Sequence, residues 1–292
     1  MAYMKVTPAT KYILSTSGRA TSIERYQTLL QEILQLDIAY LPISAYADDG
    51  LIKAGDYAQA IRGLGAIGGA ISKDIKVKII PYLDKLDSFA QKVGSVNTVI
   101  REKDLLIGYN TDAYGFEQAI REGLAQSSVK VKTALIYGYG GVFNVAYQVL
   151  TSLGIEVSLT GRRGEEVTKK NEAFGLKPYD GGPRDLFVNA SPVTDHPLNQ
   201  AKGFLEALQT SKIVFDHHMP GNFLATYCRE NAIAFIPGTA MYYPQMYKQW
   251  ALFLAGYVSP DELPALISQA ENKQVNVKNT DKSDEPISVN RK

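Results

Sequence analysis

The sequence has few residues of the kinds that build disulfides and metal centres, with one cysteine and three histidines among 292 residues. The single Cys228 excludes an intrachain disulfide and a cluster of cysteine ligands, so we expect a small buried side chain. His217 and His218 are adjacent and would face opposite sides of a strand. Neither they nor His196 have an acidic residue at metal-motif spacing. We therefore expect no metal and no Ser-His-Asp triad.

Long apolar runs and an excess of one charge are also absent. No run of 18 apolar residues exists, and residues 1–5 lack the apolar segment of a signal peptide. The formal net charge of +1 offers no basic face for nucleic acid. With 45% hydrophobic and 21% charged residues, we expect a packed, soluble, cytoplasmic protein without membrane or nucleic-acid partners, long enough for two domains.

The first part of the chain alternates strands and helices. Residues 11–15 predict a strand, and a hydroxyl-rich loop then leads to a helix for which Ser22 is the expected N-cap. A strand over 38–42, a helix around 56–64 and a short strand over 70–72 follow. This order indicates an α/β fold with a parallel sheet, in which ligands bind beyond the carboxyl ends of the strands.

Two Asn-Thr pairs stand out in the next stretch, at Asn97-Thr98 and Asn110-Thr111, each shortly after a glycine. A charged turn at 101–104 and an apolar run at 105–107 separate them. The pattern predicts two short strands, each with polar side chains at one end. Such ends suit a pocket for a polyhydroxylated small molecule, but they also occur in ordinary turns, and the pattern leaves both open.

Three lysines lie close together at Lys73, Lys76 and Lys78. One of them could point into a cleft as a general base or proton shuttle. The charge pattern alone favours a solvated helix start instead.

A second domain begins with a predicted strand over 129–137. A glycine-rich turn at 138–141, a helix to Leu153 and a strand over 155–160 follow. Glycines let the backbone approach a pyrophosphate, and the helix N-terminus supplies amide donors. The sequence therefore favours a dinucleotide site over a structural turn.

The end of that second strand indicates which dinucleotide binds. NAD sites usually carry an acidic residue there, whereas this chain has Thr160, Gly161, Arg162 and Arg163. Guanidinium groups suit a 2′-phosphate, so we expect NADP as the cofactor. The alternative is that both arginines are ordinary surface residues.

Two features of this domain are irregular. Phe143 stands where a small residue normally allows close packing of helix and strand, and 175–185 is too short for another strand and helix. Strands are expected over 185–189, 213–216 and 232–237. A helix over 238–249 should return to the first domain, Pro244 should kink it or mark its start, and a helix over 260–269 should close the fold.

Five motifs in order resemble the shikimate dehydrogenase family over about residues 8–271, namely 94–99, 108–115, 138–141, 185–193, and 238–241 with Gln245. The resemblance implies an N-terminal α/β substrate domain, a Rossmann-like NADP-binding domain, and a C-terminal helix packed back on the first domain. The expected boundaries are 1–112 with 240–271 for the first domain, 113–239 for the second, and 272–292 as a disordered tail.

The implied activity is NADP-dependent interconversion of 3-dehydroshikimate and shikimate, an oxidoreductase step of aromatic amino acid biosynthesis in the chorismate pathway. Lys76 and Asp112 match the catalytic pair, although whether Lys76 acts as a neutral base or a charged donor stays open. Ser72, Asn97 and Gln245 match substrate-binding positions. The implied cofactor-binding residues are Gly138, Gly140, Gly141, Val142, Thr160, Arg162, Arg163, Ala190, Ser191, Gly238 and Met241.

The sequence departs from the family where the substrate carboxylate should bind. The expected Ser-x-Ser is absent from the loop at 18–23, and Arg19, Thr21 and Ser22 are the candidates in its place. An Asn and a Pro before Lys76 are also lost, and a tyrosine is replaced near His218. The substrate could thus be shikimate, quinate or another cyclic hydroxy acid, bound by a monomer or homodimer. The alternative is a non-catalytic NADP(H)- or ligand-sensing protein, against which the retained Lys76 and Asp112 argue.

Overall fold

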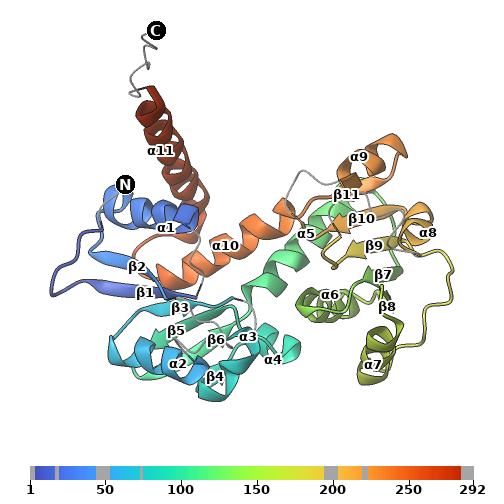
Figure 1. The fold of residues 1–292 in the computed structure, drawn as a ribbon, viewed down its shortest axis with the longest axis horizontal. Helices are drawn as coiled ribbons and strands as arrows, with labels where there is room; N and C mark the ends of the chain where they lie inside the picture. Colours follow the sequence, from blue (N-terminus) through green and yellow to red (C-terminus); the bar gives the residue numbers. More distant parts are fainter. Residues whose placement is uncertain are drawn as a thin grey trace, which may run out of the picture. The chain divides into compact units, whose positions relative to one another are not determined.

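The computed structural model describes residues 4–16, 20–43, 53–72, 75–193, 203–218 and 223–283. The chain forms two compact units with mixed α/β structure, as predicted (Figure 1). Unit 1 comprises Met1–Asp87, Ser95–Tyr109 and Gln249–Lys292, and unit 2 comprises Ser88–Gly94 and Asn110–Lys248. Three segments predicted for the first domain, 88–94, 110–112 and 240–248, belong to unit 2 instead. Ser88–Gly94 joins unit 2 because Val93 packs in that unit's hydrophobic core.

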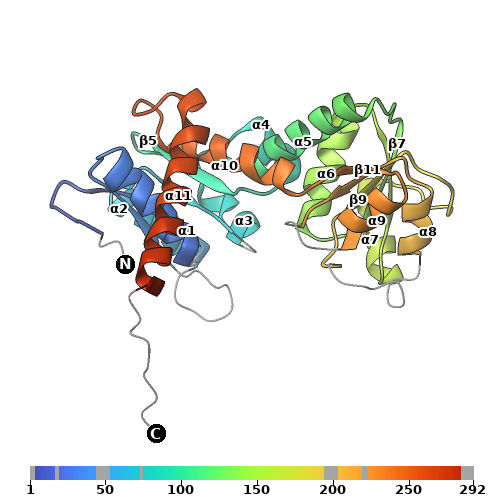
Figure 2. The same ribbon diagram turned by 90° about the horizontal axis from the view of Figure 1, so that it is seen from above.

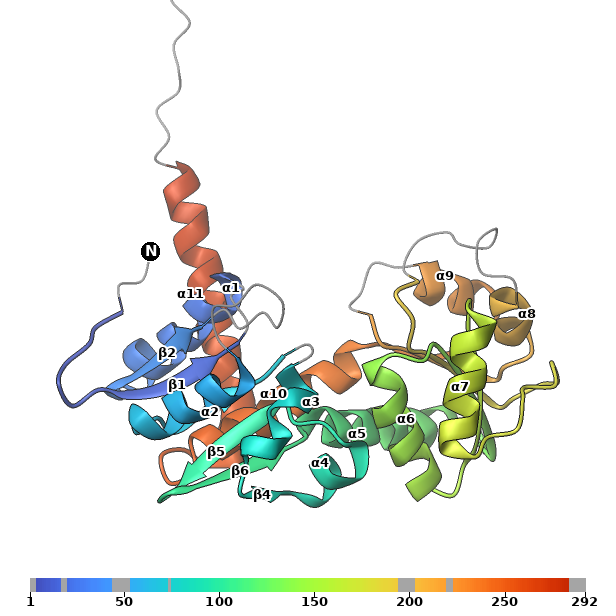
Figure 3. The same ribbon diagram turned by 60° about the horizontal axis from the view of Figure 1, so that its bottom comes forward.

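Unit 1 is built on a six-stranded sheet in the order β2-β1-β3-β5-β6-β4. Its strands are β1 Lys11–Ser15, β2 Ile38–Pro42, β3 Gly68–Ala70, β4 Lys85–Leu86, β5 Thr98–Glu102 and β6 Leu105–Tyr109. Parallel pairing of β1 with β2 and β3 changes to antiparallel pairing in β3, β5 and β6. The two Asn-Thr motifs thus flank a β5–β6 hairpin, as predicted (Figure 3). Strand β3 lies two residues before the predicted strand.

Short helices connect these strands, namely α1 Ala20–Gln27, the π-helical η1 Thr28–Ile33, α2 Ala54–Gly63, α3 Ile75–Lys78 and the 3-10 helix η2 Ile80–Tyr82. Helix α1 begins at Ala20, so the prediction that Ser22 is its N-cap is wrong. Ser22 lies within the first turn of the helix instead.

The C-terminal part of the chain packs on unit 1, as predicted. Helix α10, Thr239–Phe253, contains Pro244 in its interior and brings the fully buried Trp250 against Tyr26 and Tyr40, with ring centroids 4.4 and 5.9 Å away. The 3-10 helix η3, Pro260–Glu262, leads into α11, Leu263–Ser283. Helix α11 lies against α1 and η1 (Figure 2).

Helix α11 extends to Ser283, beyond the predicted end at Gln269. The prediction of a disordered tail is therefore wrong over 272–283, and residues 284–292 lie outside the described part of the chain. Two ion pairs hold the start of this extension against unit 1, since Glu271 pairs with Arg25 and Lys273 pairs with Glu32 at 2.5 Å. A polar composition alone cannot reveal such partners.

Unit 2 is a parallel five-stranded sheet in the order β11-β10-β9-β7-β8. Its strands are β7 Thr133–Tyr137, β8 Glu156–Thr160, β9 Leu186–Asn189, β10 Ile213–Asp216 and β11 Ala234–Ile236. One face packs against α4 Ser88–Val93, α5 Thr111–Ser127, α6 Gly141–Ser152 and α7 Gly164–Phe174. The other face packs against α8 Phe204–Gln209 and α9 Phe223–Glu230 (Figure 2). This is the predicted Rossmann-like arrangement.

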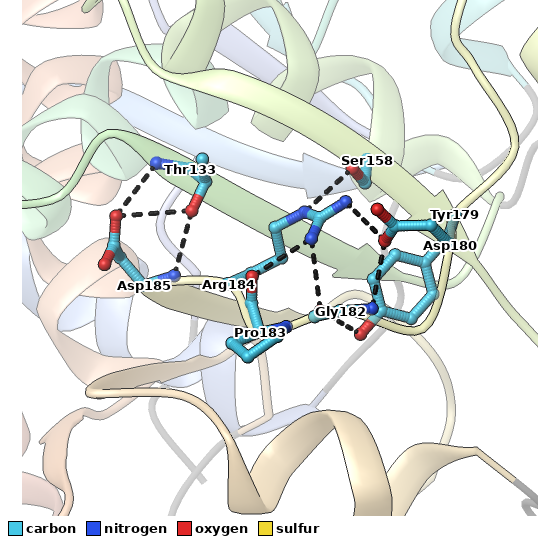
Figure 4. Close-up of polar contacts among 8 residues, drawn as sticks. All are labelled: Thr133, Ser158, Tyr179, Asp180, Gly182, Pro183, Arg184 and Asp185. Atoms are coloured by element: carbon cyan, nitrogen blue, oxygen red, sulfur yellow. Dashed lines mark hydrogen bonds and ion pairs between the residues drawn. The ribbon is translucent and has the colours of Figure 1, made fainter.

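Unit 2 is shortened between β8 and β9, as the sequence predicts. Residues 175–185, all of which the structure describes, contain no strand, so β8 is the edge of the sheet. Arg184 anchors this loop over β8 by donating from Nε to Ser158 Oγ at 3.1 Å and pairing with Asp180 at 2.9 Å (Figure 4). Its guanidinium also lies over the Tyr179 ring, 5.0 Å from the centroid. An irregular loop thus covers a position that another strand and helix would take.

Phe143 has a packing role that explains its departure from the usual small residue. It is fully buried in the core of unit 2. Its ring meets Phe174 edge-on at 5.1 Å and stacks with Tyr147 at 5.7 Å. The phenyl group therefore joins α6 to α7.

Asp185 ties together the amino ends of three strands. Its carboxylate accepts hydrogen bonds from the Thr133 amide and hydroxyl at 3.2 Å (Figure 4). It also accepts from Lys212 Nζ at 2.6 Å and from the Lys132 amide at 2.9 Å. The Lys212 bond and then the backbone amides lower the pKa of Asp185 from 3.8 to about 2.

The lowered pKa of Asp185 predicts a pH-dependent contribution to stability. Its stabilisation is complete above pH 4 and is lost as the pH falls through about 2, since protonation removes the negative charge that these donors bind. We expect Asp185→Asn to lower the free energy of unfolding by about 1–2 kcal/mol at neutral pH, with the difference from wild type vanishing as the pH falls below about 2. Denaturant titrations at several pH values measure this. The exposed Asp261→Asn is the control, and a pH-independent deficit would contradict the assignment.

Trp250 should be the main anchor of α10 in unit 1. Trp250→Ala empties a space lined by Tyr26, Tyr40 and Phe253, so we expect a loss of about 3–5 kcal/mol. Trp250→Phe keeps a ring and should lose less. Denaturation followed by circular dichroism tests both, and an unchanged midpoint for Trp250→Ala would show that the contact contributes little.

Candidate active site

The carboxyl ends of β1 and β3 bring two hydroxyls together in unit 1. These strands pair in parallel with Ser15 opposite Ala70, so the residues that follow them are neighbours. Thr16 Oγ1 accepts from the Ser72 amide at 2.8 Å and lies 2.9 Å from Ser72 Oγ. The sequence identified Ser72 as a site residue and missed Thr16, although Thr16 belongs to the hydroxyl-rich loop.

Asn97 lies beside this pair. Its carbonyl accepts from the Ile71 amide at 2.7 Å, and its side chain is almost fully buried. Thr98 Oγ1 donates to Asn97 Oδ1 at 2.9 Å, and Gln249 Nε2 donates to Thr98 Oγ1 at 2.8 Å. The side-chain oxygen of Asn97 is therefore held in place. The sequence missed Gln249, although it stands one helical turn after the predicted Gln245.

Lys76 is tied to the same edge through its backbone. It lies in α3, and its carbonyl accepts from the Val96 amide at 2.8 Å, one residue before Asn97. Lys76 is half-buried, whereas Lys78 is exposed, and Lys73 lies outside the described residues. This burial distinguishes Lys76 from Lys78, which the charge pattern could not do.

The predicted carboxylate-binding segment is only partly described. Arg19 lies outside the described residues. Thr21 and Ser22 belong to the first turn of α1, and only Ser22, which is half-buried, has a described side chain.

Asp112 and Gln245 lie near each other within unit 2. Asn110 caps α5 by accepting from the Ala113 amide at 3.0 Å, which places Asp112 in the first helical turn. Gln245 Oε1 accepts from Thr111 Oγ1 at 3.3 Å. Close packing permits this contact, since a Cβ at Gly115 would lie 2.6 Å from Gln245 Cβ. Unit 1 thus carries Ser72, Lys76 and Asn97, and unit 2 carries Asp112 and Gln245.

Gly138 brings the ends of β7, β8 and β9 together. Its φ is +119°, a conformation that side chains disfavour, and its amide donates to the Thr160 carbonyl at 2.9 Å. A Cβ at Gly138 would lie 2.7 Å from the Ala190 carbonyl oxygen and 2.9 Å from the Ser191 nitrogen. Only glycine fits this approach of two backbones.

The next two glycines leave space at the N-terminus of α6. Gly140 is the N-cap and Gly141 begins the helix, with Val142 in its first turn. Among the described atoms, none lies within 4 Å of a Cβ built at Gly140 or Gly141. Helix amides beside open space suit a pyrophosphate, so this turn fits a dinucleotide.

The arginines lie where the sequence predicts a 2′-phosphate site. Arg162 and Arg163 are exposed, directly after β8 and its last residue Thr160. The Tyr137 hydroxyl is buried and has no hydrogen-bond partner among the described residues. Burial raises the pKa of Tyr137, and the positive charge of Arg162 opposes that effect. The donors present therefore fit the anionic end of NADP.

A buried polar network supports the Ala190–Ser191 loop from behind. Asn189 Oδ1 accepts from Ser191 Oγ at 2.7 Å, and Asn189 Nδ2 donates to Asp216 Oδ1 at 3.0 Å. His218 Nε2 lies 2.6 Å from the Ser191 carbonyl oxygen. Gly238 follows the same edge, where a Cβ would lie 2.2 Å from the His218 carbonyl oxygen.

Other candidate residues have structural surroundings. Met241 is buried in the core of unit 2. Cys228 is also buried, which raises the pKa of its thiol to about 12, with the Asp216 carboxylate adding to the effect. No group of His, Cys, Asp and Glu among the described residues could hold a metal ion.

Gly138 and Gly140 provide a matched test of this turn. We expect Gly138→Ala to destabilise the fold by several kcal/mol, because the added Cβ would overlap Ala190 and the positive φ would be strained. Gly140→Ala adds a methyl group to open space at φ −76°, so stability should stay within about 1 kcal/mol of wild type. Thermal denaturation compares them, and equal midpoints would contradict the close approach.

Comparison with known proteins places these observations in a family context. No protein-family model matches the chain. The shikimate dehydrogenase (NADP(+)) of Carboxydothermus hydrogenoformans is 33% identical over 180 residues, covering 56% of this chain and 61% of that protein. Another from Bacillus cereus strain G9842 is 34% identical over 145 residues, covering 48% of this chain and 51% of that protein. The matches thus span less than two thirds of these curated relatives.

Solved structures match over most of the chain. A shikimate 5-dehydrogenase-like protein has a TM-score of 0.73 at 19% identity and covers 92% of this chain and 98% of its own. The shikimate 5-dehydrogenase of Thermus thermophilus, solved with NADP(H) and shikimate, has a TM-score of 0.67 at 22% identity, covering 89% and 99%. Within the described residues, no helix combines the length and apolar character needed to cross a bilayer. The chain therefore has the fold of the shikimate dehydrogenases and is similar in sequence to members of that family, which confirms the resemblance.

Proposed function

We propose that this protein is an NADP-dependent oxidoreductase that interconverts 3-dehydroshikimate and shikimate or a related cyclic hydroxy acid. The observation that carries the proposal is the convergence of Ser72, Asn97 and Lys76 at one sheet edge of unit 1. The curated relatives, named as NADP-dependent shikimate dehydrogenases, support the same assignment. We place the protein in the cytoplasm, in the chorismate pathway, as a monomer or homodimer.

Substrate binding follows from the polar groups at that edge. The hydroxyls of Ser72 and Thr16 and the amide of Asn97 provide donors and acceptors for ring hydroxyls. Gln245 adds a further amide from α10. Arg19, Thr21 and Ser22 are proposed to hold the carboxylate, for which charged and hydroxyl donors are suited.

Lys76 and Asp112 are the proposed catalytic pair. NADP, when bound, would supply the acceptor for the hydride of the carbinol carbon. Lys76 Nζ holds the proton of the reacting hydroxyl, directly or through water, so the oxygen becomes a carbonyl as the hydride leaves. Asp112, in the first turn of α5, orients the amine through its charge.

The proposed NADP site lies at the carboxyl edge of the unit 2 sheet. The amides of residues 140–142 would hold the pyrophosphate, and Arg162 and Arg163 would bind the 2′-phosphate. The other proposed cofactor-binding residues lie on this edge or on the segment that follows it: Gly138, Thr160, Ala190, Ser191, Gly238 and Met241.

Replacing Lys76 tests the catalytic assignment. We expect Lys76→Ala to lower kcat by roughly 10²–10⁴-fold, the usual contribution of a positioned acid or base, while the Kd for NADP stays within about twofold of wild type. NADPH formation should be followed with shikimate, quinate and a panel of hydroxy acids. Lys78→Ala, on the exposed side of the same helix, is the matched control.

The same assay separates the candidate functions. Retained turnover in Lys76→Ala would remove Lys76 from the catalytic role. No turnover of any substrate by the wild-type protein, together with measurable NADP binding by calorimetry, would favour the non-catalytic sensor instead.

A further inference from the structure

Tyr139 occupies an unusual position in the glycine-rich turn. Tyr137 and Thr160 are the last paired residues of β7 and β8, so Tyr139 and Gly161 lie just beyond neighbouring strand ends. A Cβ built at Gly161 would lie 3.2 Å from Tyr139 Cδ1 and 3.3 Å from Cε1. The edge of the phenol ring therefore occupies the place where a side chain at Gly161 would begin.

The position of Gly161 matters because the adenosine ribose normally binds beside it. In a strand-turn-helix-strand nucleotide site, the residue at the end of the second strand contacts the adenosine ribose at its 2′ position. Gly161 has no side chain for that contact. The neighbouring Tyr139 is half-buried, packed against the core of unit 2, and so has a restricted position.

Charged and phenolic groups gather at this strand end. Burial has the largest effect on the Tyr137 hydroxyl and raises its pKa. The Arg162 guanidinium lies near enough to lower that pKa, and Tyr139 lies near enough to raise it. Tyr139 and Arg162 thus both lie near the Tyr137 hydroxyl, at the ends of β7 and β8. A phosphate monoester is one of the anions that a cation and a phenolic donor can bind together.

We propose that Tyr139 is a specificity-determining residue. Its ring lies in the space that Gly161 leaves free, and its hydroxyl donates to the 2′-phosphate of the bound nucleotide beside Arg162. The inference rests on the proposed NADP dependence and extends it by naming a second recognition group. Tyr139 replaces the missing side chain at position 161, and Arg162 supplies the charge. A larger residue at position 161 would displace the ring.

Equilibrium binding to the full-length protein tests this without catalysis. Calorimetric titration compares 2′,5′-ADP with 5′-AMP, which differs from it only by lacking the 2′-phosphate. Tyr139→Phe removes only the hydroxyl and should weaken 2′,5′-ADP binding about tenfold, as expected for one hydrogen bond to a charged group. The Kd for 5′-AMP should stay within about twofold, because that ligand never makes this contact. Tyr227→Phe, a half-buried tyrosine of α9, is the control and should change neither affinity.

A second variant tests the steric part of the argument. Gly161→Ala places a methyl group 3.2 Å from the ring, tighter than ordinary contact. Displacement of Tyr139 should weaken 2′,5′-ADP binding and leave 5′-AMP binding unchanged. Circular dichroism melting of each variant checks that it is folded.

The outcomes separate the two proposals. Unchanged 2′,5′-ADP affinity in Tyr139→Phe, or an equal loss for both ligands, would overturn the role of Tyr139 and leave NADP dependence intact. A wild-type protein that binds both ligands equally would overturn NADP dependence, and the inference with it.

Discussion

The close approach of two backbones at Gly138 is the constraint on which the cofactor edge depends. At φ +119°, Gly138 lies against the Ala190 carbonyl and the Ser191 amide, where any Cβ would overlap them. This contact sets where the chain leaves β7, and hence where Gly140 begins α6. Asn189 and Asp216 hold the opposing loop from beneath through buried hydrogen bonds. Because a buried polar group that loses its partner is costly, the loop has little freedom to move away.

The edge of the unit 1 sheet that carries Ser72 and Asn97 also depends on how strand ends pair. Here the adjacent ends of parallel strands place Thr16 against Ser72, and antiparallel pairing with β5 brings Asn97 to the same edge. Each of these side chains combines a structural hydrogen bond with a position at the strand ends. Because β5 runs antiparallel to β3, the residue before β5 meets the residues that follow β1 and β3.

Local sequence signals predicted the elements well where a strong physical requirement acts on consecutive residues. The alternation of strands and helices, the hairpin around 101–104 and the shortened stretch 175–185 are of this kind. Predictions failed where distant partners decide. Helix α11 continues to Ser283 after Glu271 and Lys273 pair with Arg25 and Glu32, and Ser88–Gly94 joins unit 2 because its apolar side chains find that core.

By itself, the sequence determined the α/β fold, the glycine-rich turn, the absence of a carboxylate at 160–163, and the order of motifs that identifies the family resemblance. Only the tertiary structure placed Tyr139 against Gly161, Thr16 against Ser72, and Gln249 against Asn97. The last two contacts join residues 56 and 152 positions apart. Their partners depend on which strand ends and helix faces pack together, and no local pattern carries that information, since side-chain periodicity specifies a buried face without specifying its neighbour.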